Sequence, residues 1–138
     1  MKTKILISAA NGVVMTSLIK RLRKIFYIIG IDADLNGHAK KYCNEFYLKP
    51  NNNEKSFIKF INKIGGKVDY IFLFNDRELL RLNRNRKLIH KIQKKIVFSP
   101  KKTIDICLNK KKFYSFCKLN QINTPSSEYT KKMIVKPI

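Results

Sequence analysis

Residues 5–12, ILISAANG, decide the fold that the sequence predicts. Three consecutive apolar residues, Ile5 to Ile7, are typical of a buried strand, and the small residues Ser8 to Gly12 follow as a tight turn. Beyond the turn, apolar residues recur at the spacing of a helix: Val14, Leu18, Leu22 and Ile25. The opening segment therefore predicts a strand, a turn and a helix.

The same alternation continues along the chain. Further strands are predicted at 27–31, 45–48, 68–74 and 96–98. A helix over 57–64 stops at Gly65 and Gly66, a second begins with Asp76 as its cap, and Ser99 with Pro100 starts a third. Continuous apolar strands between amphipathic helices predict a doubly wound α/β domain with a parallel sheet. We expect this domain to span residues 1–121 and a second, truncated unit to begin at 122–138.

The chain of 138 residues carries 30 Lys and Arg against nine Asp and Glu, a formal net charge of +21. This sign favours an anionic partner. However, the basic residues are spread evenly, 24 of the 30 are Lys, and Arg is the better reader of bases. Lys, Ile and Asn, which AT-rich codons favour, make up 56 of the 138 residues. Codon composition therefore accounts for much of the charge, and nucleic acid is not the expected partner.

The three cysteines, Cys43, Cys107 and Cys117, are far apart and show no CxxC spacing. This pattern argues against a disulfide framework or a zinc site. The apolar run near the N-terminus is too short for a signal peptide or a membrane span. We therefore expect a soluble, cytoplasmic protein without a membrane partner.

In a doubly wound sheet, ligands bind at the carboxyl ends of the strands, where the strand order reverses. Four polar strand ends qualify: the turn before Gly12, the pair Asp32 and Asp34, Pro50, and the group of Asn75, Asp76 and Glu78. The aspartates are candidates to contact a ribose or a substrate amine, or else they stabilise a loop. Asp76 and Glu78 either contact a substrate or serve as cap and first-turn acid of a helix. Gly12 alone does not make a GxGxxG dinucleotide fingerprint.

Six segments together resemble the N-terminal region of ATP-grasp ligases: ILISAANG (5–12), IIGIDAD (28–34), FYLKP (46–50), DYIFLFNDREL (69–79), IVFSPKKTIDICLNKKKFYSFCKLNQINTPSSEY (96–129) and IVKPI (134–138). The resemblance is to the group that includes the carbamoyl phosphate synthase large subunit and the pyrrolysine-biosynthesis ligase. In that group a small Rossmann-like preATP-grasp domain precedes the nucleotide-binding fold. The family's Asp before the first lysine is Asn109 here.

The resemblance implies a carboxylate–amine ligase that uses ATP and magnesium. It also implies that Lys110 approaches the ATP phosphates from a helix start and that Lys136 lies on the first strand of the nucleotide-binding fold. The remaining ATP and magnesium site would lie beyond Ile138, so we expect this chain to bind neither alone and to be catalytically incomplete. Expected partners are a small-molecule substrate, the missing ATP-grasp portion as a separate chain, and a second copy in a homodimer.

Two other function classes stay open from the residues alone. A basic module that binds nucleic acid or another polyanion would use the charge of +21. A nicotinamide-dependent oxidoreductase would use the Rossmann-like turn, although that turn has one glycine.

Overall fold

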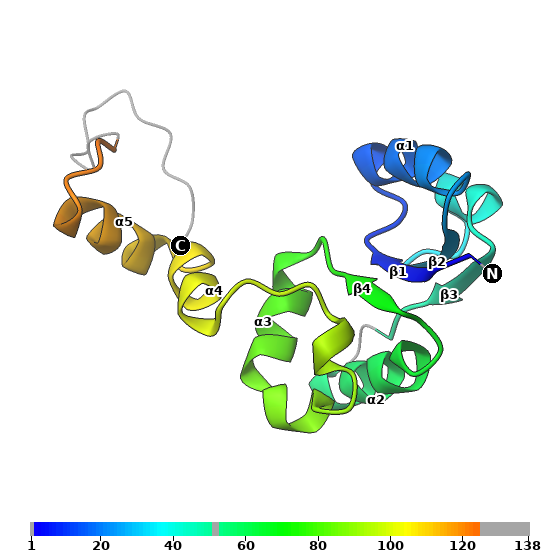
Figure 1. Ribbon diagram of the computed structural model, residues 1–138. Helices are drawn as coiled ribbons and strands as arrows, with labels where there is room; N and C mark the ends of the chain where they lie inside the picture. Colours follow the sequence, from blue (N-terminus) through cyan, green and yellow to red (C-terminus); the bar gives the residue numbers. More distant parts are fainter. Residues whose placement is uncertain (1, 51–52, 125–138) are drawn as a thin grey trace.

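The central strand of the fold is β1 (Lys4–Ser8), which pairs with a strand on each side. The computed structural model describes residues 2–50 and 53–124. Its sheet has four parallel strands in the order β3-β2-β1-β4, with β2 at Tyr27–Asp32, β3 at Glu45–Leu48 and β4 at Tyr70–Phe72 (Figure 1). Ile7 lies beside Gly30 of β2 and Phe72 of β4. The predicted parallel α/β fold is confirmed.

The fifth predicted strand, at 96–98, is reduced to a single parallel bridge between Ile71 and Ile96. The Val97 amide donates to the Ile71 carbonyl at 3.0 Å. A 3-10 turn, η3 (Gln93–Lys95), precedes this segment, and Pro100, which has no backbone N–H, follows it. The run is therefore too short to extend the ladder.

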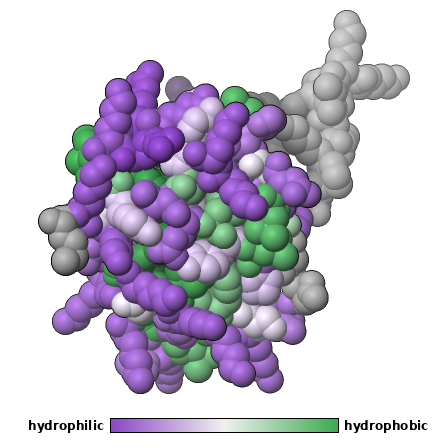
Figure 2. Space-filling model, turned by 90° about the vertical axis from the view of Figure 1, so that its right-hand side faces the viewer, coloured by the Kyte–Doolittle hydropathy of each residue, from purple (hydrophilic) through white to green (hydrophobic). Residues whose placement is uncertain are grey.

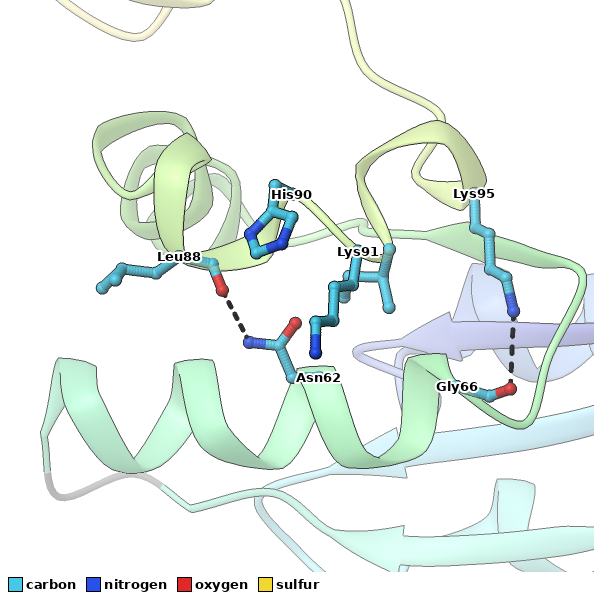
Figure 3. Close-up of a pocket in the computed structure, with 7 residues that line it drawn as sticks. Asn62, Gly66, Leu88, His90, Lys91 and Lys95 are labelled. Carbon is cyan, nitrogen blue, oxygen red and sulfur yellow. Dashed lines mark hydrogen bonds between the residues drawn. The ribbon is translucent and has the colours of Figure 1, made fainter.

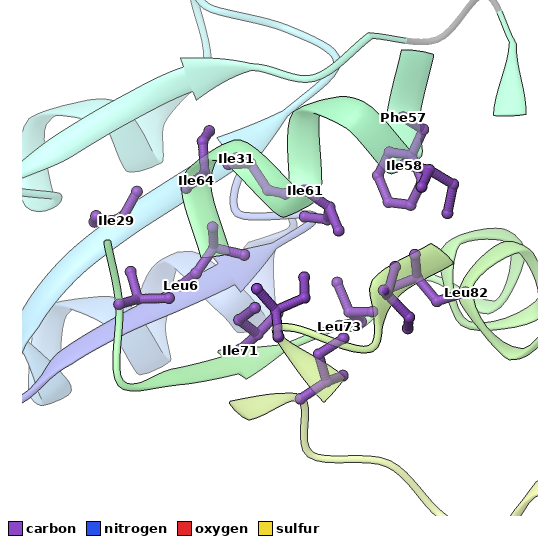
Figure 4. Packing of buried hydrophobic residues seen from close by; sticks show 14 residues of the cluster. Leu6, Ile29, Ile31, Phe57, Ile58, Ile61, Ile64, Ile71, Leu73 and Leu82 are labelled. Atoms are coloured by element: carbon purple, nitrogen blue, oxygen red, sulfur yellow. The ribbon is translucent and has the colours of Figure 1, made fainter. Parts of the chain in front are cut away.

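Helices cover both faces of the sheet. On one face, α1 (Val13–Leu22) and the 3-10 helix η1 (His38–Tyr42) pack on Ile5, Ile7 and Ile28. On the other, α2 (Glu54–Gly65), α3 (Asp76–Arg84) and the 3-10 helix η2 (Arg86–Ile89) pack around Leu6. Figure 4 shows this second cluster, with Phe57 and Ile61 of α2 facing the sheet. The alternation of strand side chains between two cores makes the sheet doubly wound.

Asparagine side chains cap three of the helices. The side chain of Asn53 accepts from Ser56 N, that of Asn75 from Arg77 N, and that of Asn109 from Lys112 N. The N-cap of α3 is thus Asn75, and the predicted cap, Asp76, is the first helical residue. Both residue types cap well, and the boundary differs by one position.

Gly65, the last residue of α2, permits close packing. A Cβ at Gly65 would lie 3.0 Å from Cδ1 of both Ile71 and Ile92. Gly66 has a right-handed φ of -60° and so needs no left-handed conformation. The helix ends where the chain must pass close to β4.

Two further helices, α4 (Lys101–Cys107) and α5 (Lys110–Leu119), follow the sheet. In Figure 1 they extend away from it, with α5 beyond α4. α5 leaves Phe113 and Tyr114 about two-fifths exposed and buries Cys117. The predicted boundary between 1–121 and 122–138 follows directly after α5 and stays a prediction.

A lysine secures the end of α2. Lys95 Nζ lies 2.7 Å from the Val68 carbonyl oxygen, 3.1 Å from that of Gly65 and 3.4 Å from that of Gly66. Figure 3 shows Lys95 at a hollow of about 430 Å³ between α2 and the η2–η3 segment. The ammonium satisfies carbonyl groups that the helix end leaves free and complements the helix dipole.

Lys95→Met should lower the free energy of unfolding by about 1–3 kcal/mol, because charged hydrogen bonds to these carbonyls are lost. Urea denaturation followed by circular dichroism measures the change. Lys94→Met is the matched control, since Lys94 is exposed and precedes it. Equal stability of the two variants would contradict the role assigned to Lys95.

Candidate functional site

The carboxyl ends of β1 and β4 are joined by a buried serine. Ser8 Oγ accepts a hydrogen bond of 2.9 Å from the Phe74 backbone N–H. After β1 the chain turns to α1 on one face, and after β4 it turns to α3 on the other. This divergence makes the switch point at which doubly wound sheets bind ligands.

The turn after β1 is held in an uncommon conformation. Ala9 has a left-handed φ of 50°, and Gly12 N donates to the Ala9 carbonyl at 3.1 Å. Gly12 is the N-cap of α1, with φ -57° and ψ 141°. A Cβ at Gly12 would lie 3.3 Å from the Ala9 oxygen, so the glycine permits a close approach of two backbone segments.

Asn11 connects this turn to the loop after β2. Its backbone N–H donates to Asp32 Oδ2 at 3.0 Å, and its side-chain amide donates to the Asp34 carbonyl at 2.7 Å. Ala39 N donates to Asn11 Oδ1 at 3.3 Å, and a Cβ on Gly37 would fall 1.9 Å from Asn11 Cγ. The structure thus brings Gly12, Asp32 and Asp34 to one edge.

The two aspartates of this edge already have loop partners. Asp32 Oδ1 accepts from Asp34 N at 3.3 Å, and Asp34 Oδ1 accepts from Asn36 N at 2.8 Å. A carboxylate can accept about four hydrogen bonds, so both retain acceptor capacity. Asp34 is exposed and Asp32 half-buried.

A buried ion pair lies at the same edge. Lys49 Nζ contacts Glu78 Oε1, with the two side chains 11% and 2% exposed. Lys49 N also donates to the Asp32 carbonyl at 2.7 Å, which ties the pair to the end of β2. Glu78 Oε2 is buried and has no hydrogen-bond partner within the described ranges. An unpaired carboxylate oxygen in a buried position can accept an N–H or O–H group of a ligand or a water.

Lys49 follows a strand and precedes Pro50, but it was not among the predicted site residues. Its position directly after a predicted strand was the sequence signal that it lies at the carboxyl edge of the sheet. The partner Glu78 is 29 residues away, and sequence spacing does not reveal such a pairing.

The remaining predicted site residues are Asp76, Lys110 and Lys136. Asp76 is exposed at the first turn of α3. Lys110 is exposed at the first position of α5, and Figure 1 shows α5 well away from β1 and β2. Lys136 lies outside the described residues.

A basic hollow of about 320 Å³ adjoins the edge between α1 and η1, and its lining includes Thr16, Lys20, His38, Lys41 and Tyr42. Lys20 Nζ lies 4.7 Å and Lys41 Nζ 5.3 Å from the centroid of the Tyr42 ring. Desolvation alone would raise the pKa of Tyr42, but hydrogen bonding to Lys20 and the charges of both lysines together lower this pKa. The hollow suits an anionic group.

Cys43 behaves as a packed thiol. Burial raises its pKa to about 11, and the hydrogen bond with the Gly30 backbone only partly opposes this shift.

In the described part of the chain, no three His, Cys, Asp or Glu side chains gather as a metal site would require. The same residues include no helix of the length and apolarity that a bilayer crossing needs.

No family model and no curated protein sequence matches this chain. Among solved structures, it is similar to N5-carboxyaminoimidazole ribonucleotide synthetase from Thermotoga maritima, with a TM-score of 0.63 and 18% identity. The match covers 96% of this chain and 34% of the synthetase, so the chain spans about a third of the length of that structure. The likeness shows a shared fold.

Breaking the Lys49–Glu78 pair should be costly. Lys49→Met should lower the free energy of unfolding by about 3 kcal/mol or more, because it leaves a buried carboxylate unpaired. The double variant Lys49→Met with Glu78→Leu should recover most of that loss, since no buried charge remains. Urea denaturation of the variants measures this coupling, and strictly additive losses would contradict it.

Thiol reactivity should follow burial. Iodoacetamide should modify the exposed Cys107 readily near pH 8, whereas Cys43 should react only as pH approaches its pKa of about 11. Because the pKa of Cys43 is raised on folding, its contribution to stability is complete below about pH 9 and is lost as pH rises through 11. Mass spectrometry of peptides gives the rates, with urea-unfolded protein as control.

Proposed function

We propose that this chain is the substrate-facing domain of an ATP-dependent carboxylate–amine ligase of the ATP-grasp type. It contributes loops at the carboxyl edge of its sheet and does not complete the reaction alone. The observation that carries the proposal is the fold: 96% of the chain superimposes on a synthetase with a TM-score of 0.63. The six sequence segments that resemble ATP-grasp ligases support the same assignment.

The substrate contacts that we propose are Gly12, Asp32, Asp34, Asp76 and Glu78. In this arrangement the start of α1 after Gly12, which has no side-chain cap, presents its first backbone N–H groups, and the carboxylates present acceptors for an amine or a ribose hydroxyl. Lys49 balances the charge of Glu78 and holds its carboxylate in place. The residues would bind and orient a small molecule at the switch point.

We further propose that phosphate and metal chemistry come from the remaining ATP-grasp portion. In the family, ATP and magnesium activate a carboxylate as an acylphosphate before the amine attacks. Lys110, at the start of α5, and Lys136 would face the ATP phosphates, since ammonium groups on fixed elements neutralise phosphate charge. Among the described residues, no three acidic side chains gather as a magnesium site would require.

The isolated chain should show no ATP hydrolysis above background with magnesium and ATP, either alone or with an amino acid added. A coupled assay for ADP release measures this. Turnover that survives repurification would contradict the proposal that the catalytic portion lies elsewhere.

Ligand binding at the edge can be tested by titrating the full chain with a ribonucleoside monophosphate and with glutamate, using amide NMR spectra. We expect the ligand to shift the amide resonances of Asn11, Gly12 and Asp34. In the Asp76→Asn variant these shifts should be severalfold smaller. Asp69→Asn is the matched control, because Asp69 is an exposed aspartate at the opposite end of β4. Shifts confined to other surfaces, or an equal effect of both variants, would argue against this site.

A further inference from the structure

An apolar groove lies on the α1 face of the sheet. It has a volume of about 450 Å³, and all its lining residues are hydrophobic or aromatic. Its floor includes Ile5 and Ile7 of β1 and Phe72 of β4, and one wall includes Leu18 and Leu22 of α1. In a doubly wound fold, a sheet surface made of such residues is normally covered by helices.

The helical layer on this face is incomplete. α1 and η1 pack over β1, β2 and β3, but the side chains of the β4 side remain open to solvent. Tyr70 is 51%, Phe74 47% and Val97 53% exposed, and all three line the groove. The uncovered strip lies beside α1, where one more helix would complete the layer.

The sequence pattern of α1 matches this open groove. Val14, Leu18 and Leu22 share one stripe of the helix, yet the residue that α1 buries fully is Ile19. Leu18 and Leu22 line the groove, and Val14, one turn before Leu18 on the same stripe, is 74% exposed. This apolar face of α1 has no partner among the described residues. Such a face supplies one side of a helix-in-groove contact, in which a second helix packs against it.

The charged residues around the groove indicate which charge its partner carries. Residues 1–31, which include β1, α1 and most of β2, contain no Asp or Glu but six basic residues: Lys2, Lys4, Lys20, Arg21, Arg23 and Lys24. Residues 92–104, around Val97, again contain bases and no acids. Asp69, beside Tyr70, is engaged by the Lys4 backbone N–H at 2.8 Å.

Figure 2 shows hydrophilic side chains over much of one face of the molecule, with hydrophobic ones gathered between them. At a net charge of +21, a second copy would be repelled, whereas an acidic partner would be attracted.

We propose that this groove binds an amphipathic helix of another protein, with an apolar face that fills the groove and acidic residues along its flanks. The helix occupies the open position beside α1 over β4. This surface is distinct from the carboxyl edge and does not depend on the ligase assignment.

The test uses three synthetic helical peptides of equal length with a fluorescent label. One carries a leucine face with glutamate flanks, the second the same leucine face with lysine flanks, and the third the glutamate flanks with serine in place of leucine. Fluorescence anisotropy with the full chain at 150 mM salt should rank the first tightest. The third controls for charge attraction alone, which salt screens.

Variants locate the contact. Tyr70→Gln, Phe74→Gln and Val97→Gln together should weaken binding of the first peptide by about tenfold or more, because three groove-lining apolar contacts are lost without a change in charge. All three side chains are about half exposed, so the fold should persist. Leu88→Gln is the matched control, since Leu88 is 59% exposed but does not line the groove.

Failure of the leucine–glutamate peptide to bind, or equal binding of the serine peptide, would overturn the proposal. So would binding that the triple variant leaves unchanged. Sedimentation that shows a dimer abolished by the triple variant would assign the groove to a second copy instead. Preferential binding to phosphatidylserine vesicles over the peptide would assign it to a membrane surface.

Discussion

The pairing of β1 with strands on both sides is the constraint on which the rest of the structure depends. Backbone hydrogen bonds hold β1 between β2 and β4, and its side chains alternate between two cores. Leu6 enters the core under α2, while Ile5 and Ile7 enter the one under α1. Because the chain leaves β1 and β4 toward opposite faces, this pairing also creates the edge where Ser8, Asn11 and Glu78 gather.

Local sequence patterns predicted the sheet well, since parallel strands buried on both faces leave continuous apolar runs. The α2 helix and its end at the glycine pair were equally readable. The segment at 96–98 looked like a strand by composition, but a strand forms only where a neighbour is available along its length. The apolar stripe at Val14 and Leu18 correctly predicted the helix α1. The stripe did not reveal that the sheet surface beside it is left uncovered.

The candidate site was predictable only in part. Polar residues after strands pointed to the turn at Gly12 and to Asp32 and Asp34, because parallel strands end at a common edge. The pairing of Lys49 with Glu78 depends on the path of the chain across the sheet, so no local pattern could reveal it. Lys110 came from a family resemblance that puts it at a helix start, and it is the first residue of α5.

Ala9 shows how this chain fixes the geometry of its ligand edge. An alanine at a φ of 50° stores about 1 kcal/mol of backbone strain that a glycine would avoid. A glycine, however, would also let the turn sample several conformations. Keeping a methyl group there restricts the peptide planes on either side to a narrow set of orientations, so Asn11 and the start of α1 hold fixed positions at the edge before a ligand arrives. The turn therefore carries this backbone strain permanently.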